Sequence, residues 1–293
     1  MNATQSLSLV LIMVTFVGLE YALGKAQKLG ATTDDNSLDL VGFGLLAAVT
    51  QPLIFWVVRT VGLAVAPAAQ NAWAGLPLYA MVLLFLVGDD MMQYWWHRLS
   101  HSPMLWPLHR AHHSAQYMSA RMIYRNNFFY YLAMPSLWIS GILIYLGLGD
   151  VYLVYIVVKL AVITGAHSAV RWDEPLYKVR ALAPLMWVVQ RTISTPATHW
   201  AHHAMTNTDG VGHYTGNFGN LLFFWDVLFG TAHITRQYPR NVGLQDDKLF
   251  GAERWYVELF YPLFKSKRVN SALVPGGTQV GESEEVLAKL RQA

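Results

Sequence analysis

The chain of 293 residues is 54% hydrophobic and only 13% charged, a composition that does not suit an ordinary soluble fold and indicates a membrane protein. Its formal net charge of +3 is small, so we expect neither a nucleic-acid partner nor an acidic substrate. The absence of cysteine excludes disulfides, thiolate metal sites and iron–sulfur clusters, and any bound metal must therefore use nitrogen or oxygen ligands.

Apolar stretches follow one another through the first 170 residues. Uncharged stretches long enough to cross a hydrocarbon core of about 30 Å occupy residues 40–58, part of 72–88, and 126–149. Two more candidates, 6–19 and 151–170, are shorter or interrupted, the second by Lys159. The block from 128 to 170 is broken at "GLGD" and is typical of a helical hairpin. We therefore predict an all-α polytopic membrane bundle of about four to five spans.

The distribution of basic residues predicts how the bundle is oriented. If the third span ends near His97, most lysines and arginines up to Arg180 lie on one side, which the positive-inside rule makes cytoplasmic. The N-terminus is then external. We assign residues 1–170 to a transmembrane region, 171–265 to a cytoplasmic helical cap and 266–293 to a solvated tail. The ending "LRQA" lacks a lysine-based retrieval signal, which favours a bacterial inner membrane over the endoplasmic reticulum.

Eight of the eleven histidines form three short motifs, at 97/101, 109/112/113 and 199/202/203. Residues three or four apart share a helix face, so each motif can aim its imidazoles at one point. Random placement would give about 0.015 copies of HxxHH, and the chain has two. A single interfacial histidine is usually structural, but so many rings indicate a metal site. Imidazole binds iron, zinc, copper or nickel, and this number of donors suits two metals with open coordination positions.

The motifs resemble a known family. "DDMMQYWWHRLSHSPMLWPLHRAHHS", "TPATHWAHH" and "NFGNLLFFWDVLFGT" are similar to the fatty acid hydroxylase/sterol desaturase superfamily, whose pattern is HxxxH, HxxHH and HxxHH with an Asn-aromatic-Gly and a WDxLFGT segment after the last motif. The resemblance covers about residues 89–233. It implies a non-haem enzyme with two iron ions that uses O₂ to hydroxylate or desaturate C–H bonds in lipids.

The resemblance also assigns residues. Its implied metal ligands are His97, His101, His109, His112, His113, His199, His202 and His203, with His167 in "GAHSAV" as a ninth. His213 is a tenth candidate donor or a residue that supports a ligand, and His233 is read as structural. Asp90 lies on one helical stripe with Tyr94, His97 and His101, and could orient a ligand histidine. Asn217 and Asp226 are read equally as supports of the metal site or as scaffold.

We expect hydroxylation rather than desaturation, because "HHSAQYMSARMIYRN" resembles the lipid-hydroxylase branches. Arg121 and Arg125 could meet an anionic headgroup, although positive-inside charge explains them equally well. Flavin, nicotinamide and haem motifs are absent, so the implied electron donor is a separate ferredoxin or a cytochrome with its reductase. A histidine-rich metal transporter is the alternative, but it requires polar residues along the spans, and these are few.

Overall fold

The computed structural model describes residues 3–26, 30–268 and 271–274, and these residues form helices with no β-strand. The prediction of an all-α fold is confirmed. The helices of the apolar region are α1 (Ala3–Ala22), α2 (Thr33–Leu45), α3 (Gln51–Val65), α4 (Leu78–Phe85), α5 (Met92–Ser100), α6 (Trp106–His113), α7 (Phe128–Ala133), α8 (Pro135–Leu143) and α9 (Gly149–His167). Those that follow are α10 (Glu174–Tyr177), α11 (Ala183–Thr192), α12 (Pro196–His202), α13 (Phe224–Phe229), α14 (Gln245–Phe250) and α15 (Trp255–Phe260).

Short segments of other helix types join several of these helices. Three are π-helical: η2 (Leu46–Thr50), η4 (Leu86–Met91) and η6 (Ile144–Leu148). Three are 3₁₀ turns: η3 (Pro67–Ala69), η5 (Ala120–Tyr124) and η7 (Arg180–Leu182). A π-helical segment often marks a functional region of a helix.

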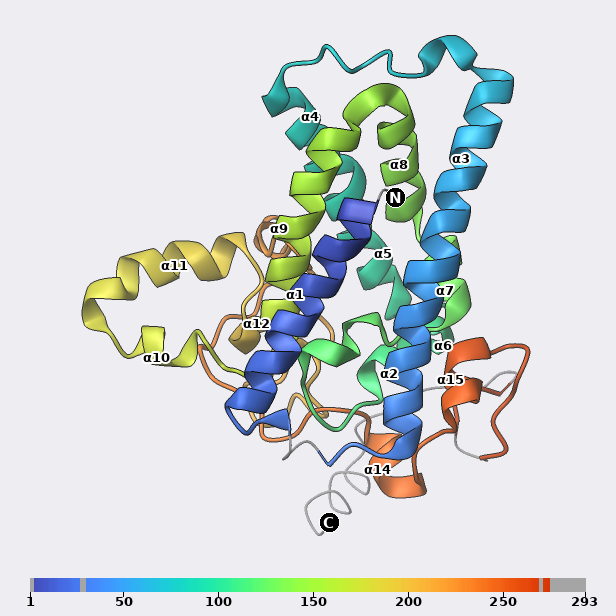
Figure 1. Cartoon of the computed structure of the whole chain (residues 1–293). Coiled ribbons are helices and arrows are strands. Elements are labelled where there is room, and N and C mark those ends of the chain that lie inside the picture. The colour runs from blue at the N-terminus through green and yellow to red at the C-terminus, as the bar shows by residue number, and fades with distance from the viewer. Residues whose placement is uncertain (1–2, 27–29, 269–270, 275–293) are drawn as a thin grey trace.

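Two helical stretches, Thr33–Val65 and Pro135–His167, are long and apolar enough to cross a membrane. The second is not straight, because Gly147 has a φ of 109° and turns α8 back along α9 as the predicted hairpin (Figure 1). Glycine tolerates this conformation, and a Cβ there would lie 3.0 Å from backbone atoms of Asn71 and Ala74. The number of spans, their sidedness and the three-part division of the chain stay predictions.

Small residues let the long helices pack closely. At Gly141 a Cβ would lie 3.2 Å from the side chains of Phe55 and Val58, so α8 approaches α3. At Gly88 a Cβ would lie 2.9 Å from Ile139, so η4 approaches α8. Close backbone approach at small residues is the usual way in which apolar helices associate in membranes. These contacts join α8 to α3 and η4 within the upper bundle of Figure 1, which also contains α4 and α9.

Buried ion pairs fix the lower end of the molecule, where the histidine motifs lie. Arg110 of α6 is fully buried and pairs with Asp246, Asp247 and Glu258, which ties α6 to α14 and α15. Removing one partner of a buried pair costs about 3–5 kcal/mol because it leaves the other charge uncompensated. Helix α6, which carries the second histidine motif, is therefore held in one position.

Candidate metal centre

The predicted ligand histidines come from four helices at the lower end of the bundle. Prolines start two of these helices in the first turn, where a missing N–H is tolerated: Pro107 in α6 and Pro196 in α12. Thr195 and Thr198 close the N-terminus of α12 with a capping box. The nine rings are distributed as His97 and His101 on or capping α5, His109, His112 and His113 on α6, His167 at the end of α9, and His199, His202 and His203 on or capping α12.

The structure gathers these nine rings into two adjacent groups. Within each group, one nitrogen per ring lies within 4.8 Å of the others. The five-histidine group is His97, His101, His109, His113 and His202, and the four-histidine group is His112, His167, His199 and His203. The groups touch, because the rings of His113 and His203 stack with centroids 4.4 Å apart.

Four rings are oriented by hydrogen bonds at Nδ1, which leaves Nε2 turned toward the group. The Nδ1 atoms of His97 and His202 lie 2.7 Å from the carbonyl oxygens of Phe218 and Gly216. The remaining two of these bonds join His109 to Asn126 Oδ1 at 2.9 Å and His167 to Ile163 O at 2.8 Å. A carbonyl oxygen at Nδ1 accepts a hydrogen bond from the ring N–H and so selects the tautomer whose Nε2 lone pair is available to a metal.

The surroundings keep the rings uncharged. Burial, reinforced by neighbouring imidazoles, lowers the pKa of the histidines on α6 and α12 well below the usual 6.5, as at His112, His113, His199 and His203. Neutral imidazole is the form that binds a metal.

One loop contains both backbone carbonyl groups that orient His97 and His202 in the five-histidine group. Asn217, between Gly216 and Phe218, has a left-handed φ of 58°, and its amide donates to Thr198 O and His233 O at 2.9 Å. Asp226 accepts the N–H groups of Phe218 and Gly219 at 2.8 and 2.6 Å. Burial raises the pKa of the Asp226 carboxyl to about 6, although these hydrogen bonds oppose the shift. Both side chains therefore act on the ligand rings through the backbone.

Asp90 acts on the same region without touching a histidine. Its carboxylate accepts the N–H groups of Leu221 and Leu222 at 3.2 and 3.1 Å and the indole N–H of Trp225 at 2.8 Å. The predicted direct hydrogen bond to a ligand histidine is not what the structure has. The carboxylate instead fixes the chain that enters α13.

His213 lies outside both histidine groups. It is half-buried, and its ring packs on that of His233 at 4.9 Å. The structure therefore does not bring the tenth candidate donor to the other nine. His233 contacts Asn217 through its backbone, in keeping with a structural role.

The headgroup hypothesis for Arg121 and Arg125 does not match their contacts. Arg121 pairs with Asp39 at 3.0 Å, and the buried Arg125 pairs with Asp35 at 2.6 Å and with Asp39 at 3.4 Å. Asp35 and Asp39 belong to α2, which follows the first apolar helix. The ion pairs therefore depend on the packing of α2 against the segment that contains Arg121 and Arg125.

Sequence reasoning missed two supporting residues. Asn126 orients His109, and nothing in the surrounding "RNN" indicates this. Glu20 accepts hydrogen bonds from Ser119 and Ala120 and from Ser168 and Ala169, which ties α1 to the segments after His113 and His167. A lone carboxylate at the end of an apolar helix was the available signal for Glu20.

A comparison with known families decides the affiliation. The family model described as "Fatty acid hydroxylase" matches residues 82–231, about half of the chain, and this segment contains all nine clustered histidines. The chain belongs to the fatty acid hydroxylase family.

The relatives of this fatty acid hydroxylase family member include three alkylglycerol monooxygenases. The protein of Xenopus tropicalis is 27% identical over 152 residues, that of Danio rerio 30% over 152 residues, and that of Homo sapiens 25% over 218 residues. These alignments cover 50%, 50% and 68% of this chain but only 29%, 29% and 44% of the relatives. No solved structure matches the chain significantly.

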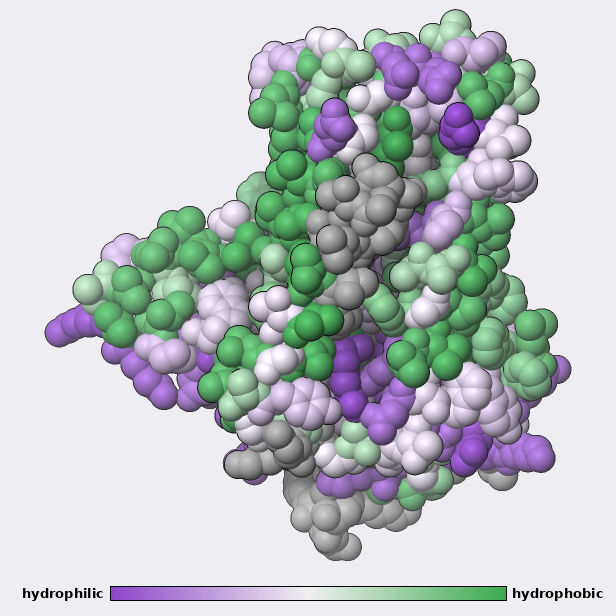
Figure 2. Space-filling view, viewed as in Figure 1, coloured by the Kyte–Doolittle hydropathy of each residue, from purple (hydrophilic) through white to green (hydrophobic). Residues whose placement is uncertain are grey.

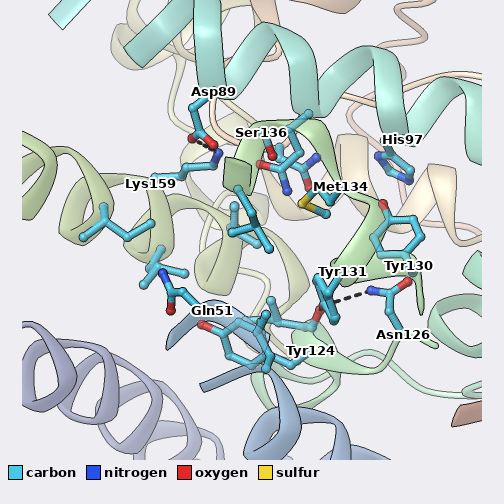
Figure 3. A pocket seen from close by; sticks show the side chains of 18 of the residues that line it. Gln51, Asp89, His97, Tyr124, Asn126, Tyr130, Tyr131, Met134, Ser136 and Lys159 are labelled. Carbon is cyan, nitrogen blue, oxygen red and sulfur yellow. Dashed lines mark hydrogen bonds and ion pairs between the residues drawn. The ribbon is translucent and has the colours of Figure 1, made fainter. Parts of the chain in front are cut away.

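A cavity leads from the histidines into the bundle of this fatty acid hydroxylase family member (Figure 3). His97 and His109 of one group and His112 and His167 of the other line it. The cavity has a volume of about 120 Å³. The other walls are largely aromatic and aliphatic, including Phe43, Leu46, Tyr130, Met134, Ile156 and Ile163. The arrangement suits an apolar chain held against both groups.

Proposed function

We propose that the chain is a membrane di-iron oxygenase that hydroxylates an unactivated C–H bond of a lipid with O₂ and external electrons. The carrying observation is the pair of buried histidine groups, each closing to within 4.8 Å, at the end of a largely apolar cavity. The donor set fits iron, because it offers neutral nitrogen ligands and no thiolate, and the family is one of hydroxylases.

Different residues of the chain would bind the metals, position the rings and hold the lipid. The five- and four-histidine groups would hold one iron each, and the loop that contains Asn217 keeps two of the rings in register. When bound, the irons would supply the activation of O₂. The cavity would align the lipid so that one carbon meets the histidine groups, and its apolar walls would exclude water from the reacting carbon. Electrons would come from a separate redox protein.

The surface supports placement in a bilayer. Outward-facing side chains on the long helices are apolar and exposed, as at Trp56, Val65, Leu83 and Val154. Figure 2 shows such side chains over the upper bundle and over the arm that carries α11, whereas hydrophilic ones gather toward the lower end. Trp187 on α11 is also exposed, and α11 runs across the direction of α9 in Figure 1, as expected of a helix lying in the membrane interface. We infer that the histidine groups lie near the cytoplasmic face.

The natural lack of cysteine makes this orientation testable. Single cysteines introduced at Gln70 and at Arg240 should react with an impermeant maleimide from opposite sides of an intact membrane. The cysteine at position 240 should be labelled only when the reagent can reach the cytoplasmic side. Labelling of both from one side would contradict the orientation.

The decisive experiment measures metal and product together. Wild-type protein should carry about two irons per chain and convert a long-chain lipid to a product heavier by one oxygen atom, only in the presence of O₂ and a reducing system. Alkylglycerol is the first substrate to test, since it is in the names of the relatives. His112→Ala should abolish the product, whereas His233→Ala, outside both groups, should retain it. A product lighter by two hydrogens would identify a desaturase, and zinc without turnover would contradict the proposal.

A further inference from the structure

A buried charge pair lies in the cavity away from the histidines. Lys159 of α9 and Asp89 of η4 are each 4% exposed, form an ion pair and line the cavity (Figure 3). Tyr155 also donates its hydroxyl to Asp89 at 2.6 Å. An ammonium has three N–H donors, and in the described part of the chain Asp89 is the only hydrogen-bond acceptor of Lys159. Donors of Lys159 are therefore left for a molecule in the cavity.

A buried acceptor lies on the same wall. Oε1 of Gln93 has no hydrogen-bond partner among the described residues, and Gln93 lines the cavity. Gln93 follows Asp89 by four residues and precedes His97 by four, so the three side chains form one stripe along η4 and α5. An unpaired buried acceptor is costly unless a ligand or water supplies a donor.

The two features together fit a hydroxyl group. A hydroxyl accepts from the Lys159 ammonium and donates to the Gln93 carboxamide, whereas a carboxylate only accepts. The Asp89–Lys159 pair is already neutral, so a carboxylate would add an uncompensated charge in a site of low dielectric constant.

Helix geometry sets the distance to the histidine groups. Eight residues separate Asp89 from His97 and also Lys159 from His167, which at 1.5 Å per residue is about 12 Å along each helix. Gln93 is four residues, or about 6 Å, from His97. An oxygen bound here would therefore lie about 6–12 Å from the histidine groups.

We propose that Lys159, Asp89 and Gln93 form a subsite for a neutral hydroxyl group of the lipid substrate. This rests on the proposed function and names its substrate class: long-chain lipids with a hydroxyl group, in preference to free fatty acids. The hydroxyl is held in the subsite, and a carbon farther along the molecule meets the histidine groups.

Binding to the iron-free, full-length protein in nanodiscs tests the subsite without turnover. The probes are radiolabelled hexadecan-1-ol, hexadecanoate and hexadecane, which share one chain length. Wild-type protein should bind the alcohol at least about tenfold more tightly than the carboxylate, because only the carboxylate brings an unpaired charge.

Asp89→Asn is the sharpest variant. It leaves the Lys159 ammonium without its carboxylate, so the preference should move toward hexadecanoate by about tenfold or more. Gln93→Leu should weaken binding of the alcohol and leave binding of hexadecane unchanged. Lys178→Met, which breaks the exposed pair with Glu174, is the control and should change nothing.

Unchanged preference in Asp89→Asn would overturn the subsite and leave the pair a purely structural contact. If that variant does not fold, the triple variant Asp89→Leu/Gln93→Leu/Lys159→Met removes both charges and the unpaired acceptor, and it should then bind alcohol and alkane equally. A retained preference for alcohol would also overturn the proposal. Because no iron enters the assay, these failures are separate from a failure of the oxygenase assignment, which iron content and O₂-dependent product measure.

Discussion

Helices α6 and α12 carry the same HxxHH spacing, yet they divide their histidines between the two groups in opposite ways. Helix α6 gives its first and last histidine to the five-histidine group and its middle one to the other group. Helix α12 gives its middle histidine to the five-histidine group and its first and last to the four-histidine group. The groups are then completed by different elements, α5 for the first and the end of α9 for the second.

The spacing explains this division. Successive residues on an α-helix are about 100° apart, whereas residues four apart differ by about 40° and lie one above the other. The doublet His112–His113, like His202–His203, therefore points in two directions, and the remaining histidine joins one of them. A single HxxHH helix can serve two neighbouring centres, and two such helices facing each other build both.

The groups differ in how their rings are held. Three rings of the five-histidine group have a partner at Nδ1, namely His97, His109 and His202. In the four-histidine group, His167 bonds to the carbonyl of its own helix, and Nδ1 of His112 and His199 has no partner within the described residues. The loop and Asn126 thus position the first group, whereas the second depends on helix packing.

The largest expected effect comes from removing one histidine of a doublet. Under the di-iron assignment, His202→Ala should empty the five-histidine site and His203→Ala the four-histidine site, so each variant should retain about one iron per chain. Turnover should fall more than about a hundredfold in both, since both metals are required. Metal analysis and titration with cobalt(II) would measure this. Loss of both metals in both variants would show that the two sites do not bind independently.

A smaller effect is expected when the loop is loosened. Asp226→Asn places an amide N–H₂ against the N–H groups of Phe218 and Gly219, so the carbonyls that hold His97 and His202 shift. Metal affinity at the five-histidine site should fall about 10–100-fold, as is usual for residues that orient ligands, with the other site unchanged. Asp209→Asn is the control, because Asp209 also accepts loop N–H groups, from Val211 and Gly212, but in a loop that contains none of the nine clustered histidines. An equal loss at both sites would contradict the selective role of the loop.

Local spacing and hydropathy predict the eight histidines of the three motifs and the helical fold, whereas His167 is implied only by the family resemblance. The sequence does not predict how the rings divide between two groups, since this requires α6 to face α12. Asp90 shows the same limit. Its helical stripe does face the segment after the third motif, but the carboxylate bonds to Leu221, Leu222 and the Trp225 indole rather than to a histidine ring. The ion pair between Lys159 and Asp89 likewise forms only because α9 lies beside η4.

The smallest effect, and the finest test of the comparison, is expected at Asn126. Asn126→Ala removes the acceptor from Nδ1 of His109, but the ring keeps its stacking on Tyr130, with centroids 5.0 Å apart and planes inclined by 19°. Metal affinity of the five-histidine site should therefore fall about tenfold or less, as measured by the same titration.

Asn127→Ala is the matched control, because this neighbouring amide donates to the backbone of Glu258 and Tyr261 and not to a ring. It removes two donated hydrogen bonds and the N-cap bond that Asn127 Oδ1 accepts from Phe129 N–H, so it should lower the free energy of unfolding by about 2–4 kcal/mol without changing metal affinity. If Asn126→Ala instead weakened the five-histidine site as much as Asp226→Asn does, stacking would contribute nothing to the position of His109. The hydrogen bond at Nδ1 would then be the sole restraint on the ring, and the four-histidine group, which has few such bonds, should be the weaker metal site.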